Sequence, residues 1–188
     1  MPAAMPFGTL WLPCVVSAVV VFIASALAHM VLKHHKADYR GLPNEEAFAE
    51  PMRKMGLAPG IYMHPHCPDM SKMKDPAVQA RFEKGPVAMI SVLPSGTPTM
   101  GKHLAQWFGF CLLVSFIASY VARHTLPLEA DGLLVMRITG TVAFTGYVLG
   151  DLQDMIWKGQ PVGNTVRGML DAIVYAVLTG LVFRLLWP

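Results

Sequence analysis

Four long apolar segments constrain the fold of this chain more than any other feature. They are Leu10–Leu32, His103–Ala122, Leu133–Gly150 and the stretch from about Val166 to Trp187. An α-helix rises about 1.5 Å per residue, so about 20 apolar residues cross a hydrocarbon core of roughly 30 Å. Charged residues make up only 14% of the chain, whereas soluble domains carry about 25%. We therefore predict an all-α membrane protein with four transmembrane helices.

These segments divide the chain into three regions. Residues 1–32 contain an N-terminal tail and the first transmembrane helix. Residues 33–102 form a long loop outside the membrane, and residues 103–188 contain transmembrane helices two to four. A loop of this length between two helices is uncommon in a small protein, so we expect it to be partly structured.

Local signals predict structure inside this loop. Its first residues, "KHHKADYRGLP", are basic and are expected at the lipid headgroups. Asn44, followed by two glutamates, predicts a short helix that ends near Gly56, and a second helix is expected from Asp75 to Gly85. Val87–Leu93 is apolar and too short to span a membrane. We expect it to form an edge strand or to lie against the membrane or a partner.

Basic residues near the ends of the spans indicate the orientation. The side that follows the first span carries most of them: Lys33, Lys36, Arg40, Lys102, Lys158 and Arg167. Lysine and arginine accumulate on the cytoplasmic side of membrane proteins. We therefore predict a protein of the bacterial inner membrane with both termini outside and the Lys33–Lys102 loop in the cytoplasm.

Small residues in the last two spans predict close helix contacts. In lipid, helices associate where small side chains let the backbones approach each other. The third span contains a GxxxG pair, and the fourth contains small residues spaced four apart: Gly146, Gly150, Gly168, Ala172, Ala176 and Gly180. We expect the two spans to form a tight antiparallel pair. The alternative is that one of these stripes contacts another protein subunit.

Four charged residues lie within the predicted spans, where charges are costly and often functional: Arg137, Arg167, Asp171 and Arg184, of which Arg184 lies near the outer end. Arg137 is close to the outer end of the third span and can extend to the interface. Asp171 lies about two turns inside the fourth span, and Arg167 precedes it by four residues. We predict an ion pair between these two residues, or a hydrogen bond to Asp171 from Tyr147 or Tyr175. The functional alternative is a small transporter that works through Asp171.

The loop segment "MHPHCPDMSKM", Met63–Met73, is rich in metal-binding side chains. His64, His66, Cys67 and Met70 are ligand types that suit zinc or copper(I). Two prolines hold the segment extended, however, which directs neighbouring side chains apart. The alternatives are therefore a metal site and an ordinary polar loop.

Two histidines at span ends raise the question of a pigment or haem. His29 lies near the inner end of the first span, and His103 opens the second. Neither has a histidine at matching depth, so they do not predict a bis-histidine haem site. Ligation of a single pigment remains an alternative. No motif for catalysis is present, and no basic run indicates nucleic acid as a partner.

Several longer motifs are similar to those of a known group of proteins. They are "LPNEEAF", "GPVAMISVLPSGTPTMGKHLAQWF" and the closing "LDAIVYAVLTGLVFRLLWP". With these motifs the chain resembles a family of four-span bacterial integral membrane proteins that have no established activity. The resemblance covers nearly the whole chain, and it implies no catalytic or binding residues.

These features together favour a non-catalytic accessory subunit over an enzyme. We expect the chain to assemble or stabilise a larger bacterial membrane complex, with respiratory or photosynthetic assemblies as natural hosts. Its expected partners are other membrane protein subunits and lipids. The alternatives are metal handling through His64–Met73 and transport through Asp171.

Overall fold

The computed structural model describes residues 6–188 and divides the chain into two compact units. The transmembrane unit comprises the chain up to Arg40 together with Thr99–Pro188. The loop unit comprises Gly41–Pro98. The loop unit is shorter at both ends than the predicted extramembrane loop of residues 33–102. The segment that follows the first span belongs to the transmembrane unit because it packs on the last helix.

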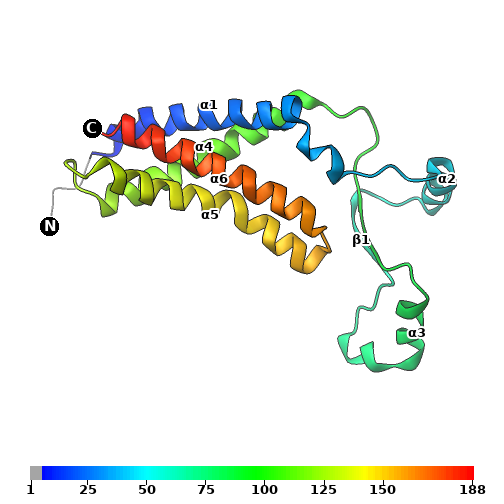
Figure 1. The fold of residues 1–188 in the computed structure, drawn as a ribbon. Helices are drawn as coiled ribbons and strands as arrows, with labels where there is room; N and C mark the ends of the chain where they lie inside the picture. The colour runs from blue at the N-terminus through cyan, green and yellow to red at the C-terminus, as the bar shows by residue number, and fades with distance from the viewer. Residues whose placement is uncertain (1–5) are drawn as a thin grey trace. The chain divides into compact units, whose positions relative to one another are not determined.

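Four long helices build the described part of the transmembrane unit, and each is long and apolar enough to cross a membrane, the first together with the turns that extend it over Gly8–Leu32. They are α1 (Trp11–Leu27), α4 (Met100–Thr125), α5 (Gly132–Lys158) and α6 (Val162–Leu185). Figure 1 shows them side by side in one bundle. The prediction of an all-α, multi-pass membrane protein is confirmed.

Short helical turns extend this bundle at its ends. The 3-10 helix η1 (Phe7–Leu10) precedes α1, and the π-helical turn η2 (Ala28–Leu32) continues it. A second 3-10 helix, η3 (His34–Asp38), follows. The last helix begins at Val162, directly after Pro161, which is one turn earlier than predicted. Proline is tolerated at the start of a helix because the first backbone N–H groups have no partner within the helix, so its missing N–H costs nothing there.

Helices α5 and α6 make the closest backbone contacts of the bundle. A Cβ atom added at Gly180 would lie 2.7 Å from the Met136 carbonyl oxygen, and one at Gly140 would lie 3.1 Å from that of Ala176. These distances leave no room for larger side chains. The two last spans therefore do form the tight pair expected from their small residues, but Gly140 takes the place of the predicted GxxxG glycines on α5.

The two glycines of the GxxxG pair have other surroundings. Gly146 faces the side chain of Val114 on α4, at 3.2 Å from an added Cβ. Gly150 has no neighbouring atom within 4 Å of such a Cβ. The prediction that both pack against α6 was wrong: at this level of the pair it is Gly168 of α6 that lies against α5, with an added Cβ 3.3 Å from the Asp151 carboxyl carbon.

Hydrogen bonds between side chains join α1 to α4. The hydroxyl of Ser17 donates to that of Ser115 across 2.9 Å, and the Trp107 indole donates to the Ser25 hydroxyl across 2.7 Å. Polar contacts of this kind stabilise helix pairs in lipid by about 0.6 kcal/mol each. Small buried residues, Ala18 and Ala118 among them, let the helices approach.

The loop unit contains the two predicted helices and a two-stranded sheet. Its elements are α2 (Glu45–Met55), β1 (Gly60–His64), the 3-10 helix η4 (Met70–Lys74), α3 (Pro76–Lys84) and β2 (Ala88–Val92). The strands are antiparallel, with Tyr62 opposite Ile90. Asn44 and Asp75 cap the two helices through their side chains. Of the alternatives for Val87–Leu93, the strand is present as β2, whereas its partner β1 was not predicted.

We predict that Gly180→Ala destabilises the protein by about 1–3 kcal/mol, because the new methyl group overpacks the α5–α6 contact. Thermal unfolding in detergent measures the change. Gly109→Ala is the matched control, since Gly109 is exposed on α4 with no atom within 4 Å of an added Cβ. Equal losses of stability in the two variants would contradict the packing described here.

Candidate functional site

The chain bends at Lys33, where the first transmembrane helix ends, and this bend builds a polar site. Lys33 adopts a left-handed conformation with φ of 54°, between the π-helical turn η2 and the 3-10 helix η3. This conformation is uncommon for a residue with a side chain. The left-handed Lys33 directs η3 onto α6. The π-helical turn η2 is a second local feature of the kind that is frequent at functional sites.

Asp171 of α6 is the centre of the site. It is 9% exposed and lies about two turns inside its helix. His34 Nε2 lies 3.0 Å from its Oδ1, and His35 Nε2 lies 2.8 Å from its Oδ2. The Tyr175 hydroxyl donates to Oδ2 across 3.4 Å. Two neighbouring histidines thus bind the two oxygens of one buried carboxylate.

A second carboxylate, Asp38, fixes His35 from the other side. The Nδ1 of His35 lies 2.5 Å from Asp38 Oδ2. The Arg167 guanidinium donates to Asp38 Oδ1 across 2.6 Å from Nε. Asn164 donates to the backbone oxygen of Asp38 across 3.1 Å. Arg167, Asp38, His35 and Asp171 therefore form one continuous line of charged groups between η3 and α6.

These contacts shift the pKa values of His35 and Asp38, which both lie in η3. Burial lowers the pKa of His35, but its hydrogen bonds to Asp171 and Asp38 and their negative charges outweigh this effect and raise the pKa above its ordinary value. Burial likewise raises the pKa of Asp38, yet the hydrogen bonds from His35 and Arg167 hold it below the ordinary range. Both shifts favour an imidazolium between two carboxylates.

His29, in η2, lies against this network. Its ring is stacked on that of His35, with the centroids 4.2 Å apart and the planes 8° from parallel. Its Nδ1 lies 2.9 Å from the backbone oxygen of Ser25. A carbonyl oxygen only accepts hydrogen bonds, so Nδ1 is the donor, and in the neutral ring Nε2 is then the nitrogen with the lone pair.

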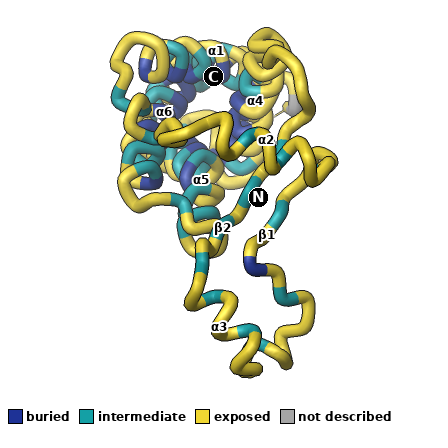
Figure 2. Tube along the Cα trace, turned by 90° about the vertical axis from the view of Figure 1, so that its right-hand side faces the viewer, coloured by how far each residue is buried: buried dark blue, intermediate teal, exposed yellow. Residues whose placement is uncertain are grey.

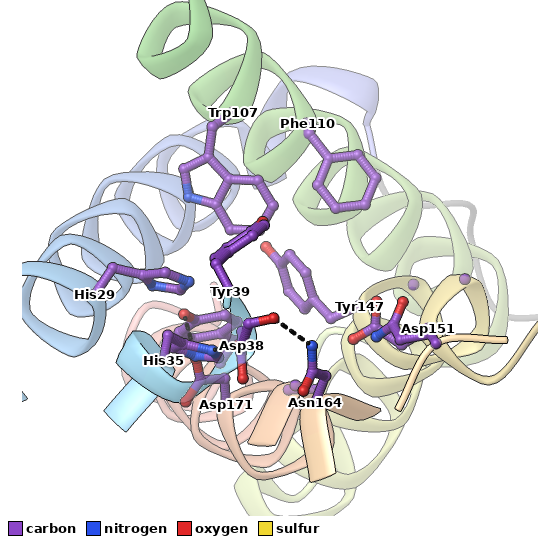
Figure 3. Close-up of a pocket in the computed structure, with 16 residues that line it drawn as sticks. His29, His35, Asp38, Tyr39, Trp107, Phe110, Tyr147, Asp151, Asn164 and Asp171 are labelled. Atoms are coloured by element: carbon purple, nitrogen blue, oxygen red, sulfur yellow. Dashed lines mark hydrogen bonds and ion pairs between the residues drawn. The ribbon is translucent and has the colours of Figure 1, made fainter. Parts of the chain in front are cut away.

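The site opens into a cavity of about 540 Å³ within the transmembrane unit. His29, His35 and Asp171 line one side, and Figure 3 shows the aromatic rings of α4 and α5 opposite them. The aromatic residues of the lining are Tyr39, Trp107, Phe110, Tyr147 and Tyr175. A third carboxylate, Asp151 of α5, also lines the cavity. The cavity therefore combines acidic, imidazole and aromatic groups.

The predicted ion pair between Arg167 and Asp171 was wrong. Arg167 binds Asp38, and Asp171 binds the two η3 histidines. The predicted pair joined two residues of the same span, whereas the segment after the first span, η3, packs on α6 and supplies the partners of both. The alternative hydrogen bond from Tyr175 to Asp171 is present.

The metal-binding residues predicted in the loop are not brought together. His64 Nδ1 lies 2.8 Å from the Pro86 backbone oxygen, and the Cys67 thiol donates to the Asp69 backbone oxygen across 3.2 Å. His64 ends strand β1, His66 follows in the segment beyond it, and the exposed Met70 begins the 3-10 helix η4. Among residues 6–188, His64, His66 and Cys67 form no group of close ligand atoms.

The other predicted residues lie at or outside the borders of the site. The residues of the predicted small-residue stripes that line the cavity are Gly146, Gly150, Gly168 and Ala172. Only Gly150 leaves open space, since an added Cβ at Gly146 would meet Val114 and one at Gly168 would meet the Asp151 carboxylate. Arg137 is exposed in a surface groove between α5 and α6. His103 is exposed in the first turn of α4 and does not line the cavity, whereas His29 does.

Sequence reasoning missed His34, His35 and Asp38, which it assigned to a headgroup-facing stretch. A signal was present. The first span ends and the fourth begins on the same side of the membrane, so "KHHKAD" lies at nearly the same depth as Asp171. An acid buried in one span and basic groups at the end of another predict a contact between them.

Comparisons with known proteins give no family for the chain. No protein-family model, no curated protein and no solved structure matches it. The family resemblance suggested by the sequence motifs therefore stays a prediction, and function has to be inferred from the residues of the two units.

Proposed function

We propose that the protein is a non-catalytic accessory subunit of a larger membrane assembly, and that a partner protein binds its loop unit. One observation carries this proposal. Within Gly41–Pro98 only Pro65 is buried. Figure 2 shows the strands and α3 in the colours of exposed and intermediate residues. A unit of this size without a hydrophobic core gains too little from burial to be stable alone.

Large apolar side chains that would form such a core are instead exposed. They are Leu42, Phe48, Met55, Ile61, Met63, Met70, Val87, Met89 and Leu93. Isolated exposed apolar residues are normal, whereas a group of them on one small unit indicates an interaction surface.

Helix α2 illustrates the kind of contact expected. Phe48, Met52 and Met55 are spaced four and three residues apart and share one face, opposite Glu50 and Arg53. Phe48 and Met55 are 44% and 59% exposed. Amphipathic helices of this type bind an apolar groove of a partner through such residues.

The sheet leaves a second surface without a partner. Ile61, Met63 and Met89 lie on one face of the two strands, and all three are exposed. A two-stranded sheet is at best marginally stable alone in water. The proposed partner covers this face and stabilises the sheet.

The proposal includes a location in a bacterial inner membrane, with the loop unit in the cytoplasm and both termini outside. The basic residues near the span ends support it. Cys67 allows a direct test, because it lies in the loop unit while Cys14 and Cys111 lie within spans. A membrane-impermeant maleimide should label Cys67 in inside-out vesicles and leave it unlabelled in intact spheroplasts. The reverse pattern would contradict this orientation.

The partner proposal is tested with the full chain, tagged at its C-terminus and expressed at native level. After extraction in mild detergent, we expect it to migrate on a native gel in an assembly much larger than its own mass. Cross-linking with mass spectrometry should then place the same partner protein on the loop unit in independent preparations.

Two variants on opposite faces of α2 sharpen this test. Phe48→Asp should release the partner by placing a charge in the apolar contact. Glu50→Gln alters the polar face, where the exposed ion pair to Lys54 contributes little, and should retain the partner. A wild-type chain that runs alone, or a Phe48→Asp variant that keeps its partner, would overturn the proposal. Cross-links to lipid alone would do the same.

A further inference from the structure

We propose that His29, His35 and Asp171 bind a divalent transition-metal ion of the zinc class. Among residues 6–188, these three form the one group of histidine, cysteine or acidic side chains whose ligand atoms all lie within 4.8 Å of one another. They come from η2, η3 and α6, so a shared ion would join three elements. This inference is independent of the partner proposed for the loop unit.

The hydrogen bonds around the two histidines match those of metal ligands. A metal-binding histidine nearly always donates its second ring N–H to a carboxylate or a backbone carbonyl. His29 does so to the Ser25 carbonyl across 2.9 Å, and His35 does so to the Asp38 carboxylate. Both rings are thereby held with Nδ1 as donor, which leaves Nε2 as the ligand atom.

The supporting groups are themselves fixed by further contacts. Arg167 holds Asp38 in place through its guanidinium. His34 binds the Oδ1 of Asp171 across 3.0 Å, which leaves Oδ2 directed toward His35. Each of the three ligands thus has a neighbour that orients it, and orientation by such neighbours strengthens metal binding.

The ligand types identify the class of ion. Two imidazoles and one carboxylate suit zinc, cobalt(II) and related ions, at about 2.0–2.2 Å from each ligand atom. Ligand atoms at that distance from one ion lie about 3–4 Å apart. A shared ion therefore requires the three ligand atoms to move closer together and the stacked rings of His29 and His35 to turn, so that both Nε2 atoms point at it. The ion would take the place of the proton between His35 Nε2 and Asp171 Oδ2, now 2.8 Å apart.

The cavity supplies the remaining coordination position. Three protein ligands leave at least one position for water or another small ligand. All three line the cavity of about 540 Å³, so that position faces a space large enough for solvent.

Cobalt binding to the full-length protein tests the proposal. The chain is purified in detergent with a tag that contains no histidine, stripped with a chelator, and titrated with Co²⁺. We expect about one ion per chain, a visible ligand-field band typical of nitrogen and oxygen ligands, and displacement of the band by Zn²⁺. His29→Gln should abolish the band, and Asp38→Asn should weaken binding roughly 10–100-fold.

Matched variants separate loss of the site from loss of the fold. His29 has its hydrogen bond within its own helix, so His29→Gln should keep the wild-type melting temperature without metal. The triple variant His64→Gln, His66→Gln, Cys67→Ser removes the loop ligands and should bind Co²⁺ as the wild type does. No band in the wild type, a band retained in His29→Gln, or a band lost in the loop variant would each overturn the proposal.

Discussion

The buried carboxylate of Asp171 is the constraint on which the architecture of the transmembrane unit depends. A charge inside a membrane helix is costly unless another group compensates it. Here the compensating groups are His34 and His35, more than 130 residues earlier in the chain. The chain must therefore bend toward α6 after α1, and the left-handed Lys33 makes that bend. Asp38 and Arg167 complete the contact, so one buried acid places the whole η3 segment on α6.

Helix packing and the cavity follow from the distribution of small residues. Gly140 and Gly180 bring α5 and α6 together toward one end of the pair. Toward the other end, Gly150 borders the cavity with no atom within 4 Å of an added Cβ. Gly146 there makes room for Val114, and Gly168 for the Asp151 carboxylate. Glycine thus permits close packing of α5 and α6 near one end of the pair and borders the cavity near the other. Asp171 of α6 lies at the level of the cavity, where it binds His34 and His35.

The transmembrane helices could be predicted from the sequence because length and hydropathy alone define a span. The short loop helices followed from local signals, Asn44 and Asp75, that act on their own neighbours. The site could be predicted only in part. Asp171 stood out as a buried acid, but its partners depend on a bend of the chain at Lys33 for which there is no local sequence signal. The loop histidines were conspicuous in composition, yet strand pairing directs His64 to a backbone oxygen instead.

The most direct test of Asp171 as the organising residue is hydrogen exchange of residues 33–40 in the Asp171→Asn variant, in detergent with a chelator present. Each hydrogen bond to a charged group contributes about 1.5–3 kcal/mol, so exchange in this segment should become about 10–100-fold faster. Asp154→Asn, which removes only an exposed ion pair to Lys158, should leave it unchanged. If residues 33–40 exchange at the wild-type rate in Asp171→Asn, the segment is held by something else and the account is wrong.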